Sequence, residues 1–95
     1  GAQVEEAISI AHIGDICMYL SEYEDASRHF EESLGKARAI DHHELEGECE
    51  RKLGEIALER GDVAGARARL ARSLEVCTRA EDRRGEAMAR WWIGW

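Results

Sequence analysis

The stretch EGECERKLGEIALERGDVAGA, residues 46–66, decides the fold because near-copies of it stand on both sides at a spacing of 40 residues. In each copy a glycine follows Ile or Leu, and these glycines are Gly14, Gly54 and Gly94. Further matches at the same offset are Ile16 with Ile56, Ala26 with Ala66, Phe30 with Leu70, Ser33 with Ser73, Leu34 with Leu74, and Glu46 with Glu86. Self-similarity at a fixed period is the sequence signature of a solenoid, in which stacked units bury a continuous core.

The composition favours helix along the whole chain. Proline is absent from the 95 residues, and the strong helix formers Ala, Glu, Arg and Leu dominate. Apolar side chains recur at three- and four-residue spacing between short breaks. We expect helices over residues 2–20, 22–39, 42–60, 63–80 and from residue 83 onward. Such short loops make neighbouring helices antiparallel, so the sequence predicts an all-α array of five antiparallel helices.

The array forms one domain, residues 1–95, without an internal linker. Repeat 1 spans residues 2–40, repeat 2 spans residues 41–80, and residues 81–95 form the first helix of a third unit. Roughly three or more repeats are usually needed to bury a continuous core. We therefore interpret the two and a half units as an excerpt of a longer solenoid.

Turn residues and glycines predict the helix ends and contacts. Ser21 and Asp41 are predicted N-caps, and in Gly61-Asp62 the glycine is expected to take a left-handed C-cap while the aspartate caps the next helix. Gly14 costs about 1 kcal/mol relative to alanine inside a helix. Its recurrence predicts a place where hairpins approach too closely for a Cβ, with Ala26 as the small residue opposite.

Apolar stripes and cysteines indicate the core and the compartment. The stripe expected on the first helix consists of Ile10, Ile13, Cys17 and Leu20. Cys49 and Cys77 fall on the equivalent stripes, where cysteine acts as a small hydrophobe. Three widely spaced cysteines are not a disulfide framework and favour a reducing compartment. No signal peptide or apolar run of about 18 residues occurs, so we expect a cytoplasmic protein.

The net charge of −7 is unevenly distributed. Residues 1–60 carry 15 acidic and 6 basic side chains, whereas residues 61–95 carry 5 acidic and 7 basic ones. An acidic module repels phosphate backbones and anionic lipid. We therefore expect neither nucleic acid nor a membrane surface as a partner.

These features together resemble the tetratricopeptide repeat family. The chain is similar to its 40-residue type, found in the Leu-Gly-Asn repeats of polarity scaffolds and in the helical sensor arms of bacterial signal-transducing regulators. The matching motifs are Ile13-Gly14, Leu53-Gly54 and Ile93-Gly94, the run Gly61 to Ala66 with its counterpart Ser21 to Ala26, the apolar Phe30 and Leu70, and DRRGEA at residues 82–87. The resemblance implies an α-α superhelix whose concave wall is lined by the first helix of each unit.

The sequence departs from the family pattern at three kinds of position. Serine replaces the family's alanine near the end of the second helix, at Ser33 and Ser73, and the proline between units is absent. Asp15 and Glu55 stand where an asparagine often grips a ligand backbone. An anionic side chain there would repel the carboxylate of a peptide.

Helical spacing assigns the expected concave face. Its residues are Ile8, Ala11, His12, Asp15 and Tyr19 from the first helix, Glu48, Arg51, Lys52, Glu55 and Glu59 from the third, and Met88, Trp91, Trp92 and Trp95 from the last. We expect this face to bind a peptide that bears basic and apolar residues. The alternative is that Asp15, Glu55 and Glu59 are solvated charges that pair with Arg51 and Lys52 at helical spacing.

The last helix carries a dense aromatic cluster, Trp91, Trp92 and Trp95. Such a cluster either packs against the next helix of a longer protein or forms an exposed patch. We expect self-association through this helix, giving a homodimer.

Chemistry-bearing motifs are weak. His42-His43-Glu44 with Glu46 lacks the H-E-x-x-H order and a third ligand, so a helix start is the better interpretation. Nucleophile–base–acid sets and phosphate-binding glycine loops are absent from the sequence, and the carboxylates fall on solvated helix faces. We predict no enzyme, no catalytic residue, no metal site and no cofactor.

The resulting hypothesis is a scaffold module that binds a peptide segment of a partner in its concave groove. The alternatives are an effector-sensing arm of a bacterial regulator and an oligomerisation spacer. A small-molecule site needs a closed concave pocket with convergent polar groups, and two and a half units scarcely curve enough to form one.

Overall fold

The computed structural model describes residues 1–93 of the chain, and the side-chain surroundings of residues 1–92. Its helices are α1 (Ala2–Tyr19), α2 (Tyr23–Ala39), α3 (His43–Glu59), α4 (Val63–Arg79) and α5 (Arg83–Ile93). Each predicted helix is present, with its ends within one residue of those predicted. The all-α class is therefore confirmed, whereas Gly94 and the predicted site residue Trp95 lie outside the described residues.

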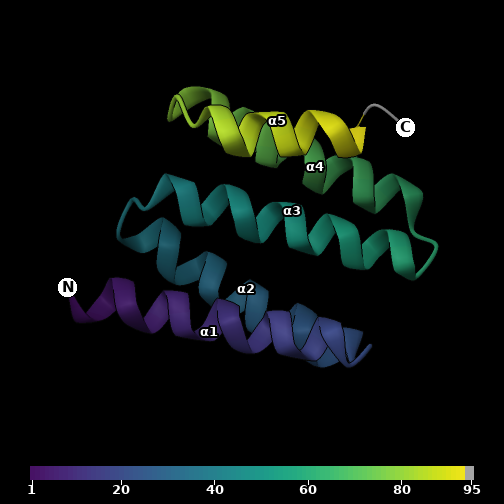
Figure 1. Ribbon diagram of the computed structural model, residues 1–95, viewed down its shortest axis with the longest axis horizontal. Helices are drawn as coiled ribbons and strands as arrows, with labels where there is room; N and C mark the ends of the chain where they lie inside the picture. The colour runs from purple at the N-terminus through teal and green to yellow at the C-terminus, as the bar shows by residue number, and fades with distance from the viewer. Residues whose placement is uncertain (94–95) are drawn as a thin grey trace.

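The helices form two layers. α1, α3 and α5 lie side by side in the front layer, and α2 and α4 lie behind them (Figure 1). Consecutive helices pack against each other, and α3 also touches α1 and α5. Within the described part of the chain α1 contacts neither α4 nor α5. The chain therefore rises as an open superhelical array, as predicted, and does not close into a bundle.

One turn geometry recurs at every junction between these helices. Four residues spaced 20 apart have φ between 55° and 81°: Ser21, Asp41, Gly61 and Glu81. Only glycine adopts this left-handed conformation without a steric penalty. Each turn therefore consists of a helix end, one left-handed residue and the N-cap of the next helix.

This geometry confirms one predicted turn and corrects two others. After Gly61, the Asp62 Oδ1 accepts a hydrogen bond of 2.9 Å from the Gly65 N–H, as predicted. The prediction that Ser21 and Asp41 are N-caps was wrong. They occupy the left-handed position, and Glu22 and His42 are the N-caps that follow them.

The buried face of α1 is made of small residues: Ala7, Ala11, Gly14 and Cys17. The predicted stripe was therefore correct for Cys17 but wrong for Ile13 and Leu20, whose side chains are 45% and 59% exposed. The exposed apolar stripe of α1, which consists of Ile13, Ile16 and Leu20, is not covered by α2, because α2 packs over the small residues instead. An apolar surface consequently remains uncovered on α1.

The recurring glycines mark close packing inside each hairpin. A Cβ on Gly14 would lie 2.9 Å from the Cζ of Phe30, and a Cβ on Gly54 would lie 2.9 Å from the Cγ of Leu70. The predicted close approach is therefore present. The nearest partners, however, are large side chains of the same hairpin, so the predicted contact between successive hairpins was wrong. In the second hairpin the carbonyl oxygen of Ala66, the counterpart of Ala26, would lie 3.3 Å from a Cβ on Gly54.

The two serines that depart from the family pattern fasten each hairpin internally. The Ser33 hydroxyl donates to the Ala7 carbonyl at 2.8 Å, and the Ser73 hydroxyl donates to the Gly47 carbonyl at 2.7 Å. Both donors and both acceptors are 40 residues apart, so the two hairpins share one internal geometry.

A buried carboxylate joins the two hairpins. Glu50 of α3 has no exposed surface and accepts hydrogen bonds from Arg38 of α2 at 2.9 Å and Arg69 of α4 at 2.8 Å. Arg38 also reaches Glu46, and Arg69 also reaches Glu31. This network holds α2, α3 and α4 in a fixed relation, which in turn positions the front layer.

Candidate partner-binding face

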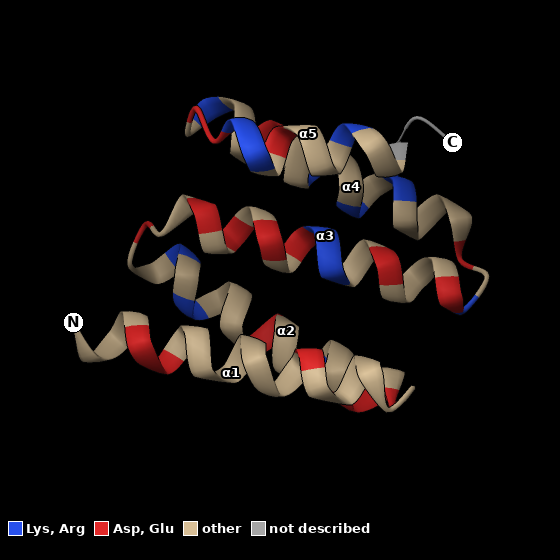
Figure 2. Cartoon of the chain, in the orientation of Figure 1, with Lys and Arg blue, Asp and Glu red and all other residues tan. Residues whose placement is uncertain are grey.

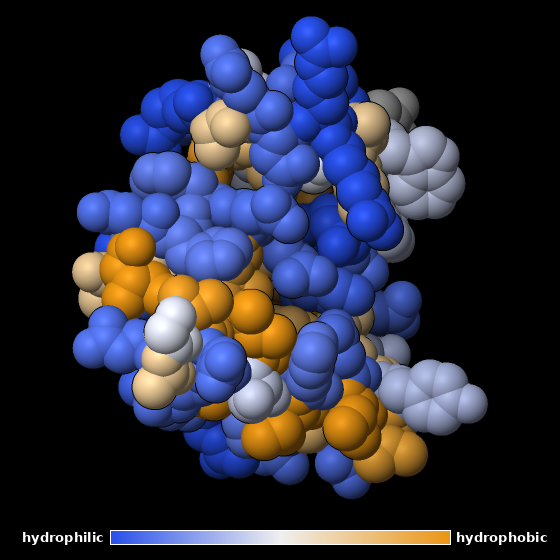
Figure 3. Space-filling view, turned by 60° about the vertical axis from the view of Figure 1, so that its left-hand side comes forward, coloured by the Kyte–Doolittle hydropathy of each residue, from blue (hydrophilic) through white to orange (hydrophobic). Residues whose placement is uncertain are grey.

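We use the name A-helix face for the solvent-exposed side of the front layer, which is formed by α1, α3 and α5. Figure 3 places this face to the right, where the outline of the molecule is hollowed between its upper and lower ends. Acidic residues mark α1 and α3, whereas basic residues are more frequent along α4 and α5 (Figure 2). The front layer therefore forms a hollowed surface of mixed charge.

The centre of the face is occupied by paired charges. The Lys52 Nζ of α3 lies 3.3 Å from the Asp15 Oδ1 of α1, and the Arg51 Nη1 donates to the Glu55 Oε2 at 2.6 Å. Burial raises the pKa of Glu55, against the attraction of the neighbouring Arg51 and Lys52. Arg51 and Glu55 thus satisfy each other, whereas the buried Asp15 Oδ1 has the Lys52 ammonium nearby but accepts no hydrogen bond from the described residues.

Of the remaining predicted residues of α1 and α3, Ala11 was wrongly placed on this face, because it is 4% exposed and belongs to the core, and Ile8 packs against that core. The others are open to solvent. His12, Tyr19, Glu48 and Glu59 are exposed, and Tyr19 is 89% exposed. Because the central acids are paired, Glu48 and Glu59 are the carboxylates of this face that are best placed to meet a partner.

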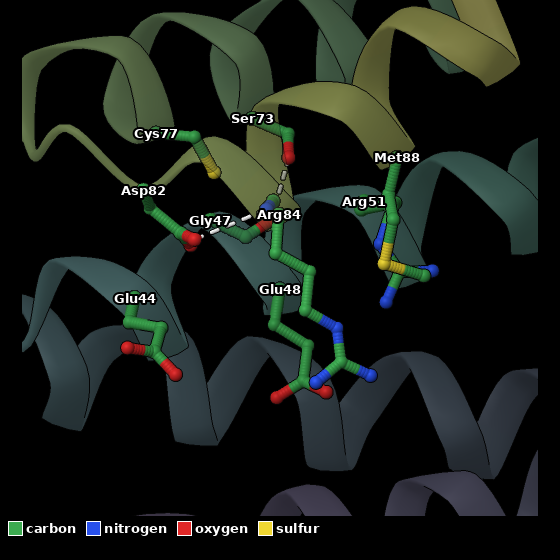
Figure 4. A pocket seen from close by; sticks show the side chains of 10 residues that line it. Glu44, Gly47, Glu48, Arg51, Ser73, Cys77, Asp82, Arg84 and Met88 are labelled. Atoms are coloured by element: carbon green, nitrogen blue, oxygen red, sulfur yellow. Dashed lines mark hydrogen bonds between the residues drawn. The ribbon is translucent and has the colours of Figure 1, made fainter.

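A cavity of about 180 Å³ opens between α3, α4 and the start of α5. Its lining consists of Glu44, Gly47, Glu48, Arg51, Ser73, Cys77, Asp82, Arg84, Gly85 and Met88. Figure 4 shows Arg84 and Met88 extending from α5 toward Glu48 and Arg51 of α3. The cavity therefore brings together three predicted residues, Glu48, Arg51 and Met88.

The rest of this lining was missed in the sequence. The Cys77 thiol lies at the cavity floor, where burial raises its pKa. A Cβ on Gly47 or on Gly85 would each lie 2.6 Å from its Sγ. The overlooked signal is in the repeat register, because Gly85 stands where the preceding unit has Leu45.

The aromatic end of the face is partly exposed. Trp91 is 73% exposed, and its ring meets that of Trp92 edge-on, with centroids 5.2 Å apart and an interplanar angle of 86°. Met88 is also exposed. These side chains give α5 an apolar surface next to the cavity.

The histidines of the helix start have a structural role. The Nδ1 of His42 accepts a hydrogen bond of 3.1 Å from the Leu45 N–H and so caps α3. In residues 1–93 no group of three or more His, Cys, Asp or Glu side chains is arranged to hold a metal ion. Similarly, none of the described helices is both long and apolar enough to cross a bilayer.

Comparison with known proteins places the repeat pattern in a family. Residues 5–79, which cover most of α1 and all of α2 to α4, match the family model described as tetratricopeptide repeat. No curated protein matches the chain.

Proposed function

Because the chain belongs to the tetratricopeptide repeat family, whose repeats are generally protein–protein interaction modules, we propose that its A-helix face binds a peptide segment of a partner. The observation that carries this proposal is the hollowed surface of α1, α3 and α5. It combines exposed carboxylates with exposed aromatic groups at both ends.

The charges favour a partner with basic and apolar side chains. Asp15 and Glu55 already have cationic neighbours, whereas Glu48 and Glu59 are exposed on the same face. Tyr19 and Trp91 supply apolar surface at opposite ends. Electrostatic complementarity would steer such a partner, and the aromatic groups would supply most of the affinity.

The test is a charge reversal on the A-helix face. A peptide selected by display against the wild-type chain is titrated into the double variant Glu48→Lys/Glu59→Lys, and we expect at least a tenfold loss of affinity. The matched control is Glu24→Lys/Glu75→Lys, which makes the same charge change at exposed positions of α2 and α4. Equal affinity of the two double variants would contradict binding at the A-helix face.

A second candidate function, an assembly arm, is favoured by the uncovered apolar stripe of α1. Ile13 and Ile16 are 45% and 59% exposed, whereas their counterparts Leu53 and Ile56 in α3 are buried against α2. Figure 3 shows hydrophobic surface gathered over the half of the molecule that holds α1 and α2. The stripe matches the face with which α3 receives α2, so a further amphipathic helix of the α2 kind would fit it.

Self-association through the last helix remains a prediction, supported by the exposure of Trp91. Sedimentation velocity separates the two assembly surfaces. A dimer abolished by Trp91→Ala uses α5, whereas a dimer abolished by Ile16→Glu uses α1. A monomeric wild-type chain at about 100 μM would contradict self-association by either route.

The effector-sensing alternative is less favoured. Small-molecule pockets usually have volumes of roughly 300–1,000 Å³. The cavity between α3 and α5 is smaller, at about 180 Å³, and it suits one side chain better than a whole effector.

A further inference from the structure

The cavity between α3, α4 and α5 has a filled counterpart one repeat earlier. Its ten lining residues correspond, 40 residues back, to Val4, Ala7, Ile8, Ala11, Ser33, Ala37, His42, Glu44, Leu45 and Glu48. The matching hydrogen bonds of Ser33 and Ser73 show that the two sites have the same backbone frame. A difference in filling therefore arises from side chains.

Leu45 fills the earlier site. Its side chain is 4% exposed and belongs to the same buried cluster as Ala7, Ala11 and Ala37. In the later site Gly85 replaces Leu45 and Cys77 replaces Ala37. The later site thus lacks a leucine side chain that this junction can accommodate.

The chain cannot fill this space from Gly85 itself. A Cβ on Gly47 of α3 would approach the Cys77 Sγ to 2.6 Å, and a Cβ on Gly85 of α5 would approach the Asp82 Oδ2 to 2.5 Å and the Cys77 Sγ to 2.6 Å. A side chain at either glycine would therefore require its neighbours to move, and the cavity lined by Gly47, Gly85 and Met88 stays unfilled.

The polar groups of the cavity floor already have partners. The Ser73 hydroxyl donates to the Gly47 carbonyl, and the Asp82 carboxylate accepts from the Gly85 N–H at 3.0 Å. An occupant of the floor consequently has no polar group to satisfy, which favours an apolar side chain. At the rim, Glu44, Glu48 and Arg84 are exposed, and Arg84 extends toward Glu48, so a basic residue of the occupant is favoured on the Glu44 side (Figure 4).

We infer that this cavity is the subsite for one leucine-sized apolar side chain of the bound peptide, with a basic residue on its Glu44 side. The inference rests on the proposed function of the A-helix face. The cavity measures about 180 Å³, with Gly47, Cys77 and Gly85 in its lining and charged residues, among them Glu44, Glu48 and Arg84, around them.

The test copies the filled site into the open one. The double variant Cys77→Ala/Gly85→Leu recreates the Ala37 and Leu45 pair and should close the cavity, with the Asp82 carboxylate turning away from the new Cβ. The control Gly35→Leu also adds leucine to a helix, at a glycine with open space around it.

The probes are the acetylated, amidated pentapeptides Lys-Gly-Leu-Gly-Lys and Lys-Gly-Ala-Gly-Lys, titrated while the amide signals of Gly47 and Gly85 are followed by NMR. In the wild-type chain and in Gly35→Leu, we expect the leucine peptide to bind at least tenfold more tightly than the alanine peptide. The variant Cys77→Ala/Gly85→Leu lacks the Gly85 signal, so its affinities are measured from the Gly47 signal. These affinities should be equal for the leucine and alanine peptides.

Two results would overturn the subsite. One is the absence of a leucine preference in the wild-type chain, and the other is its survival in a folded double variant. If both peptides bind equally and Glu48→Lys/Glu59→Lys weakens them, the subsite fails while the proposed function stands. If the leucine preference is present but that charge reversal has no effect, the subsite stands and the wider peptide-binding face fails.

A second variant covers the case in which the double variant does not fold. The single variant Cys77→Ala removes the thiol and enlarges the cavity. The ratio of its affinity for a phenylalanine version of the probe to its affinity for the leucine version should therefore be at least threefold higher than in the wild-type chain. An unchanged ratio of the two affinities would count against the subsite.

Discussion

Removal of the two arginines that hold Glu50 should destabilise the fold strongly. The double variant Arg38→Met/Arg69→Met leaves a carboxylate with no exposed surface and without either of its two hydrogen-bond donors. A hydrogen bond to a charged group contributes about 1.5–3 kcal/mol. Arg38 is half exposed and Arg69 one quarter exposed, so solvent screening lowers the share of Arg38 in particular.

The expected loss for the double variant is about 3–5 kcal/mol, the usual cost of an uncompensated buried charge. At about 0.05–0.15 kcal/mol per residue, a chain of this length has a total stability of roughly 5–14 kcal/mol. The variant should therefore lose about a fifth or more of its stability. Urea denaturation followed by far-UV circular dichroism measures this loss, provided that the m-value is unchanged.

The triple variant Arg38→Met/Glu50→Ile/Arg69→Met separates a buried charge from lost packing. The first unit carries Ile10 at the position equivalent to Glu50, and replacement of a whole buried ion network by apolar residues is often neutral or stabilising. We expect the triple variant to recover most of the loss, and the exposed control Arg28→Met to change stability by less than about 1 kcal/mol. A triple variant as unstable as the double variant would refute this reasoning.

Three further outcomes follow from the turns, the glycines and the thiols. Replacement of the left-handed Ser21 by glycine should raise the free energy of unfolding by roughly 0.5–1 kcal/mol, and Gly61→Ala should lower it by about 1–2 kcal/mol, both measured by urea denaturation. In the same assay Gly14→Ala should destabilise by up to about 2 kcal/mol, because its Cβ would press on a buried ring, whereas Gly35→Ala in open space should stabilise by up to about 1 kcal/mol. Burial raises the pKa of Cys49 from 9.0 to about 11, so at pH 8 its native thiol should react with a disulfide reagent roughly 100-fold more slowly than in urea; equal rates would contradict this burial.

The repeat register predicted the fold well because helix formation and turn chemistry are local. The spacing of Gly14 and Gly54 and the Gly61-Asp62 turn place the helices without knowledge of distant contacts. The burial of Cys17, Cys49 and Cys77 follows from the same periodicity. The order of the helices then gives the two layers, since short turns leave few other arrangements.

The register was less informative about which helix faces meet. Ile13 and Leu53 occupy equivalent positions and look alike in sequence, but only Leu53 is covered, because α2 lies over α3 and no described helix lies over the stripe of α1. Burial at such positions depends on a neighbouring unit, so it cannot be read from the pattern within one helix.

The candidate site shows the same limit for charged residues. Helical spacing predicted Asp15, Lys52 and Glu55 on one face, but the pairing of Asp15 with Lys52 depends on the distance between α1 and α3. Glu50 was missed because nothing in its local pattern indicates that arginines of α2 and α4 converge on it. Long side chains from neighbouring helices decide these contacts.

The positions that depart from exact repetition produce the features that distinguish one helix junction of this array from the next. Positions that repeat, such as Ser33 and Ser73, preserve the internal geometry of each hairpin. Positions that break the repeat, Glu50 for Ile10 and Gly85 for Leu45, produce the buried network and the open cavity. Since the frame is common to both units, the absence of the leucine side chain at Gly85 leaves a cavity where the first unit has a filled core.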